Sequence, residues 1–151
     1  MRAYQLPIWV WPAALMIVCG LALWRGRDDE RLAAAATLAN WSITLLVSRP
    51  LSGETQWPVL AVDAVLLVLM VWLALRSNRY WPLFSAAFAL LIVVTHITHA
   101  LDTGVSVWAY LTATLIWSYF ILFTIGYGAW TAPYVRAADV TADATPGATL
   151  R

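Results

Sequence analysis

The sequence predicts an all-α integral membrane protein, built as one bundle of five transmembrane helices. Hydrophobic residues make up 62% of the 151 residues, charged residues only 11%, and the mean hydropathy is +0.74. A soluble domain averages about 45–50% apolar and about 25% charged residues, so this composition does not suit a surface in contact with water on all sides. Five apolar runs, separated by short polar segments, have the length that a helix needs to cross about 30 Å of hydrocarbon.

The first two predicted helices span residues 4–24 and 32–48. Pro7 and Pro12 lie in the first half of the first helix, where a membrane helix tolerates proline. This run is too long for the core of a signal peptide, and no A-x-A-like site follows it, so we expect it to be retained. The second helix is rich in small and polar side chains, which favour close packing inside the bundle. The acids 28–30 precede it, where they suit the positive end of the helix dipole.

The other three predicted helices span residues 58–75, 81–100 and 107–130. The connection 76–79 is short, so the third and fourth helices are expected to be antiparallel neighbours. The remainder, residues 131–151, is polar and rich in Ala, Thr, Asp and Pro, and we expect it to be a disordered cytoplasmic tail. The five-helix domain thus covers residues 1–130.

The distribution of arginine predicts the orientation in the membrane. All nine basic residues are arginine, and five spans place seven of them on one side and two on the other. Because positively charged loops stay in the cytoplasm, we expect the N-terminus outside and the C-terminus inside. The seven are Arg25, Arg27, Arg31, Arg76, Arg79, Arg136 and Arg151, and the two are Arg2 and Arg49.

The short loops exclude several function classes. No loop exceeds about ten residues, so no extramembrane domain is expected, and motifs for nucleotide or nucleic-acid binding are absent. The expected partners are the lipid bilayer and, beyond it, other membrane proteins or further copies of the chain, but no nucleic acid.

The strongest chemical signal is a cluster of polar residues in the outer half of the predicted bundle. Both histidines, His96 and His99, lie near the end of the fourth helix and share a broad face with Asp102. Asp63, on the third helix, is expected at the depth of His96, and Asn40 lies near mid-bilayer. Buried ionisable residues in a membrane usually face the bundle interior, a cavity or each other. The candidate site is therefore Asn40, Asp63, His96, His99 and Asp102.

Several interpretations of this cluster remain open. In a structural one, Asp63 or Asn40 bonds a histidine and fixes how the third and fourth helices pack. In a metal site, His96 and His99 would bind zinc or copper together with a carboxylate. In a pocket open to the outside, Asp63 and His96 would bind a proton, a small cation, or the head of a quinone or lipid. A haem ligated by both histidines of one chain is disfavoured, because they point the same way from one helix.

One stretch resembles a known group of proteins. Residues 78–83 (N-R-Y-W-P-L), followed by Thr95-His96 and Asp102, are similar to small uncharacterised inner-membrane proteins of alphaproteobacteria. The resemblance covers roughly the third to fifth helices. It implies a bacterial inner-membrane location and brings no catalytic residue with it.

The expected function is inferred from two features that the sequence lacks. Without a soluble domain or a strong catalytic constellation, we expect a non-enzymatic inner-membrane protein of accessory or scaffold type, which binds a partner through its helices and needs no cofactor. The alternative is a membrane protein that handles a ligand, proton or metal through Asp63, His96 and His99. These two hypotheses can be distinguished by whether Asp63 and His96 face each other within the bundle.

Overall fold

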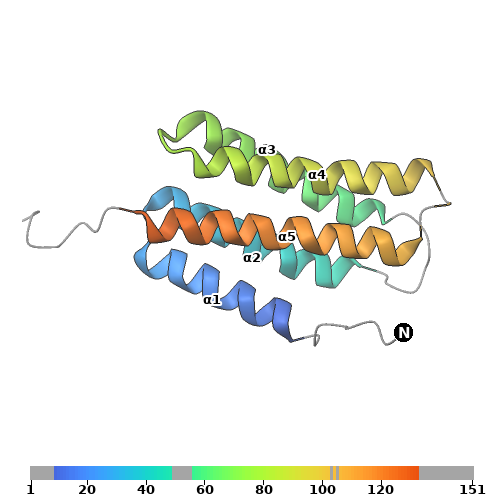
Figure 1. Cartoon of the computed structure of the whole chain (residues 1–151), viewed down its shortest axis with the longest axis horizontal. Helices are drawn as coiled ribbons and strands as arrows, with labels where there is room; N and C mark the ends of the chain where they lie inside the picture. The colour runs from blue at the N-terminus through green and yellow to red at the C-terminus, as the bar shows by residue number, and fades with distance from the viewer. Residues whose placement is uncertain (1–8, 49–55, 103, 105, 133–151) are drawn as a thin grey trace, which may run out of the picture.

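The computed structural model describes residues 9–48, 56–102, 104 and 106–132. This part of the chain is all-α and forms five helices (Figure 1). Each helix packs against its neighbours in sequence, and α1 packs against α5, so the five helices form a closed ring. The helices are α1 (Val10–Arg25), α2 (Asp28–Val47), α3 (Trp57–Arg76), α4 (Trp81–Leu101) and α5 (Val107–Trp130).

The start of α2 differs from the expected one. The helix begins at Asp28 rather than near residue 32, and its first turn consists of three acids. These acids lie at the positive end of the helix dipole, which favours negative charge. The described part leaves out residues 4–8 of the first expected helix, the loop 49–55, and residues 133–151 of the expected tail.

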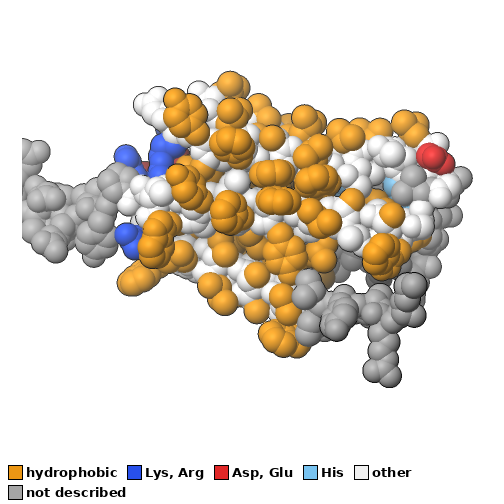
Figure 2. Space-filling view, in the orientation of Figure 1, with side chains coloured by type: hydrophobic (Ala, Val, Ile, Leu, Met, Phe, Trp, Pro, Cys, Tyr) orange, Lys and Arg blue, Asp and Glu red, His pale blue; other side chains and the backbone are white. Residues whose placement is uncertain are grey.

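Three helices, α3, α4 and α5, are each long and apolar enough to cross a membrane. Helix α1 is apolar but has only 16 residues, and α2 combines 20 residues with an acidic first turn. Hydrophobic side chains cover the middle of the face shown in Figure 2. Leu46, Leu75 and Leu101 are 85%, 84% and 83% exposed, as side chains in contact with lipid tails would be. These features indicate a membrane protein.

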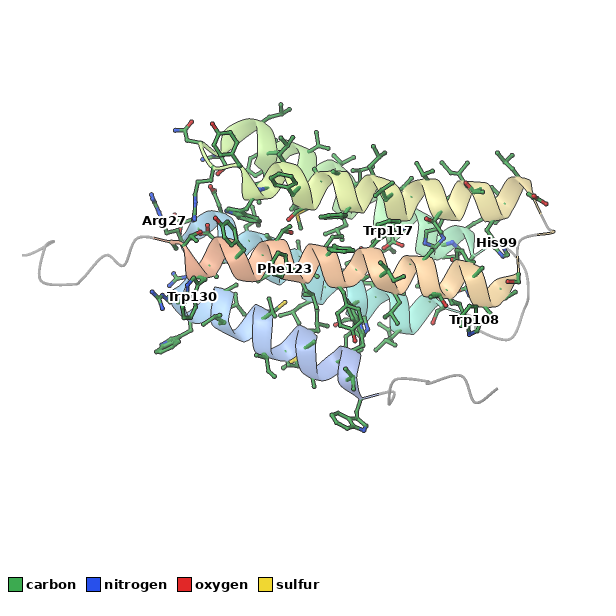
Figure 3. All side chains as sticks on the ribbon, viewed as in Figure 1. Arg27, His99, Trp108, Trp117, Phe123 and Trp130 are labelled. Carbon is green, nitrogen blue, oxygen red and sulfur yellow. The ribbon has the colours of Figure 1, made fainter. Side chains whose placement is uncertain are left out.

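Polar groups lie at the two ends of the helix bundle, where the helices begin and end, and apolar side chains fill its middle. Leu15, Met70 and Leu73 are fully buried there. Figure 3 shows Arg27 and Trp130 at one end and His99 and Trp108 at the other. We call the first the arginine end, which carries Arg25, Arg27, Arg76 and Arg79, and the second the histidine end, which carries His96, His99 and Asp102.

Candidate functional site: a hydrogen-bonded network beside a cavity

A series of three hydrogen bonds joins four helices near the histidine end. Asn40 Nδ2, from α2, donates to Asp63 Oδ1 on α3 at 2.9 Å. Asp63 Oδ2 lies 2.9 Å from His96 Nε2 on α4. The hydroxyl of Tyr110, from α5, lies 2.8 Å from His96 Nδ1. We call these four residues the polar network.

The topology explains why these side chains meet. Helices α3 and α4 are antiparallel neighbours, so Asp63, early in α3, faces His96, near the end of α4. Helix α5 runs back along α4, so Tyr110 in its first turns reaches the same level. The three residues are almost completely enclosed, with 7%, 1% and 7% of Asp63, His96 and Tyr110 exposed. Three separate helices are thus linked through one imidazole ring.

Hydrogen-bond chemistry orients the Asn40 amide. A carboxylate can only accept, so the amide nitrogen of Asn40 must face Asp63 and its oxygen must point away. That oxygen, Oδ1, is buried and has no partner among the described residues. Asn40 therefore presents an unused acceptor on the side away from Asp63.

One arrangement of hydrogens satisfies the rest of the network. If Asp63 is ionised and His96 is neutral, His96 Nε2–H donates to Asp63, and the Tyr110 hydroxyl donates to His96 Nδ1. If His96 Nδ1 carried a hydrogen instead, Tyr110 would accept it, and its own hydroxyl hydrogen would have no acceptor within the described residues. The arrangement that leaves no donor unused contains an ionised Asp63.

The other two predicted residues take different positions. His99 is buried and stacks on Tyr110, with ring centroids 4.5 Å apart and an interplanar angle of 17°. Its Nδ1 has no partner in the described part of the chain. Asp102 ends α4 at the exposed surface, where its Oδ1 accepts from the backbone N–H of Gly104 at 2.8 Å. Of the five predicted residues, the structure brings Asn40, Asp63 and His96 into one network, leaves His99 beside it, and leaves Asp102 outside.

A cavity of about 370 Å³ lies beside the polar network and is lined by residues of all five helices. Its wall is mainly apolar, with Trp11 from α1 and Trp41 from α2 among the large side chains. Asn40, Asp63, His96 and Tyr110 also line it, as does Thr44, whose buried Oγ1 has no partner among the described residues. Two residues of the lining, Asn40 and Thr44, thus each carry a buried polar atom without a partner among the described residues.

The geometry does not favour the metal interpretation. Both ring nitrogens of His96 are already hydrogen-bonded, so a metal there would displace Asp63 or Tyr110. The described ranges contain no group of three or more His, Cys, Asp or Glu side chains that could hold a metal ion.

A second buried polar cluster lies at the arginine end, and we did not predict it from the sequence. Glu30 is fully buried, forms an ion pair with Arg79, and accepts from Trp81 Nε1 at 3.0 Å. Arg79 Nη2 also donates to Gly128 O at 3.2 Å and to Thr131 Oγ1 at 2.6 Å. The groups of this cluster are bonded to one another and connect α2, α4 and α5. We therefore interpret the cluster as a structural element.

Two residues of the site were not predicted from the sequence. Neither Tyr110 nor Thr44 carries a charge at neutral pH, so nothing in the sequence singled them out. No protein family, curated protein or solved structure matches this chain. What the chain binds therefore has to be inferred from the polar network and the cavity.

Proposed function

We propose that this chain is a small multi-pass protein of the bacterial inner membrane that binds a small amphiphilic molecule in the cavity at its histidine end. One observation carries the proposal: the 370 Å³ cavity has a largely apolar lining that also includes the polar network and Thr44. Ligand sites typically combine such an apolar concave wall with a few convergent polar groups.

The membrane topology is part of the proposal. Five spans, with the N-terminus outside and the C-terminus in the cytoplasm, would place the arginine end in the cytoplasm and the cavity toward the outer face. The described arginines support this orientation, since Arg25, Arg27, Arg31, Arg76 and Arg79 flank the α1–α2 and α3–α4 connections, which lie at the same end of the ring. The ligand would then enter from the outer leaflet or the extracytoplasmic space.

Thermal unfolding in dodecyl maltoside micelles tests the binding proposal. Three probes share a phenyl ring and a short chain but differ in head group: phenethylamine, phenethyl alcohol and 3-phenylpropanoate. We expect at least one of them to raise the unfolding temperature of the wild-type protein, because a ligand that binds only the native state stabilises it.

Two leucine substitutions on α2 provide the matched comparison. Thr44→Leu fills part of the cavity and breaks no hydrogen bond of the described structure, whereas Ser42→Leu lies on the exposed side of the same helix. The stabilisation should persist in Ser42→Leu and disappear in Thr44→Leu. If no probe stabilises the wild type, or if Thr44→Leu responds as the wild type does, the cavity is not a binding site.

An accessory or scaffold subunit is the second candidate function, and one surface favours it. A groove of about 500 Å³ runs between α4 and α5, and all four phenylalanines of the chain line it. Phe84 and Phe123 are 56% and 70% exposed there, and Figure 3 labels Phe123 in the middle of α5. The aromatic lining consists of Tyr80, Trp81, Phe84, Phe88, Phe120, Phe123 and Tyr127.

Photocrosslinking tests this second candidate. A benzophenone amino acid in place of Phe123 should give one discrete protein adduct in cells if a partner helix lies in the groove. The same amino acid in place of Leu46, which is equally apolar and 85% exposed on α2, is the control. Lipid adducts alone at both positions would contradict the scaffold function.

A further inference from the structure

We infer that the ligand of this cavity is a protonated amine with an apolar body, held by Asp63. The inference rests on the proposed function and specifies the chemical class of its ligand. It follows from three properties of the lining residues: their hydrogen-bond acceptors, their charge, and their aromatic side chains.

The hydrogen-bond acceptors carried by the lining residues Asn40, Asp63 and Thr44 favour a ligand that donates hydrogen bonds. Asn40 Oδ1 can only accept, and its orientation is imposed by the Asn40 Nδ2–H bond to Asp63. Thr44 Oγ1 can accept as well as donate. An ammonium group carries up to three donors and no acceptor, so it matches this wall better than a carbonyl or carboxylate would.

The charge of the lining favours a cation. Asp63 lines the cavity, and its hydrogen-bond partners among the described residues are Asn40 and His96, which is neutral in the fully satisfied arrangement. The described arginines lie at the arginine end, remote from Asp63. A carboxylate without a counter-charge inside a membrane bundle is costly, and such groups pair with an opposite charge or mark a ligand pathway. An ammonium ligand would supply the missing charge.

Aromatic side chains complete the match. Trp11 and Trp41 both line the cavity, and Tyr110 borders it beside the network. A cation beside an aromatic face is attracted to it, and tryptophan is the strongest partner. The same side chains, with Leu66 and Ile92, give an apolar surface for the body of the ligand. Anionic molecules would be repelled by an ionised Asp63, and quinones carry no hydrogen-bond donor for the acceptors of the lining residues.

A ligand series on the wild-type protein tests the inference without any substitution. Phenethylamine carries charge and N–H donors, phenethyltrimethylammonium carries charge without N–H donors, and phenethyl alcohol carries one donor without charge. Apparent Kd values follow from the dependence of the unfolding temperature on ligand concentration. We expect the amine to bind about tenfold more tightly than either analogue, because hydrogen bonds between charged partners are the strong ones.

Asp63→Asn removes the charge and keeps the shape of residue 63, and it replaces one of the two acceptor oxygens by an N–H donor. We expect it to weaken phenethylamine binding about tenfold or more and to leave phenethyl alcohol binding nearly unchanged. Ser85→Ala is the control, because it removes another buried interhelical hydrogen bond, the 2.6 Å bond to Thr124, away from the cavity. Its affinity for the amine should equal that of the wild type. If Asp63→Asn does not fold, the ligand series decides alone.

The outcomes separate this inference from the proposed function. If phenethyl alcohol or 3-phenylpropanoate binds in the cavity as tightly as the amine, the binding function stands and the amine inference is overturned. Equal affinity for the trimethylammonium analogue also overturns it, since the N–H donors would then contribute nothing. If none of the probes binds, both proposals fail.

Discussion

Glu30 and Arg79 form an ion pair that ties the first turn of α2 to the connection before α4. Only 1% of the Glu30 side chain is exposed, against 24% of Arg79. The Nε1–H of Trp81 and the backbone N–H of Arg27 donate to the same carboxylate, at 3.0 and 2.9 Å. The buried Glu30 carboxylate thus accepts from three donors. These contacts link the helices at the arginine end, opposite the polar network.

Removing this carboxylate is expected to destabilise the bundle strongly. Glu30→Ala leaves Arg79 without its counter-charge and Trp81 Nε1–H without an acceptor. We expect the free energy of unfolding to fall by about 3 kcal/mol, the lower end of the range for broken buried pairs, because part of Arg79 reaches the surface. Unfolding in mixed micelles of mild detergent and dodecyl sulfate measures it. Asp28→Ala, exposed in the same helical turn, should cost less than about 1 kcal/mol, and an equal loss for both would contradict the assigned role.

Two glycine positions should respond oppositely to alanine. A Cβ at Gly128 would lie 2.8 Å from the ring of Trp81, which is 3% exposed and held by Glu30, so the ring has little room to move. Gly128→Ala should cost about 1–3 kcal/mol through overpacking. At Gly20 nothing lies within 4 Å of an added Cβ, so Gly20→Ala should be neutral or stabilise by up to about 1 kcal/mol. The same unfolding assay measures both, and a harmless Gly128→Ala would show that α4 and α5 are packed less closely.

Tyr110→Phe tests the hydrogen bond between Tyr110 and His96. The substitution leaves the buried Nδ1 of His96 without a partner, which should lower the free energy of unfolding by about 1–3 kcal/mol. Tyr119→Phe is the matched control on the same helix. The described contact of Tyr119 is an edge-to-face one with Trp11, at 4.8 Å between ring centroids, and phenylalanine keeps it. Equal stability of the two variants would mean that the Tyr110 hydroxyl does not bond to His96.

Cysteine labelling tests the proposed orientation. In a Cys19→Ala background, Ser106→Cys places one thiol in the exposed connection before α5, and Asn78→Cys places one between α3 and α4. We expect a membrane-impermeant maleimide to label position 106 in intact cells and position 78 only after lysis, because positively charged loops stay inside. The reverse pattern would refute the orientation and move the cavity to the cytoplasmic side.

Much of the fold could be predicted from the sequence, because hydrophobic run length is a direct physical signal. The all-α class and the five helices are confirmed, since each apolar run between polar breaks becomes one helix. The number of membrane crossings stays a prediction for α1 and α2. For α2 the reason is visible: Asp28, Asp29 and Glu30 belong to the helix itself, so its apolar part is shorter than its length.

The candidate site was only partly predictable. Asp63 and His96 could be predicted to lie at the same depth, because both are ionisable and because two antiparallel neighbouring helices set their depths. Tyr110 has no charge to mark it, and the position of α5 around the ring does not follow from run length. Glu30 was not singled out for a different reason: the sequence marks it only as one of three acids at a helix start, and its burial depends on the tertiary contact with Trp81.

Nitrogen-15 NMR of histidine-labelled protein tests the central claim most directly, because the chain has only two histidines. We expect a neutral His96 with its hydrogen on Nε2, in contact with an ionised Asp63, and a shift of both ring signals when phenethylamine is added. Asp63→Asn should shift the ring signals of His96, since the carboxylate beside Nε2 is replaced by a neutral amide. A His96 with its hydrogen on Nδ1 in the wild type, or ring signals that respond to neither Asp63→Asn nor the amine, would contradict the network and its role beside the cavity.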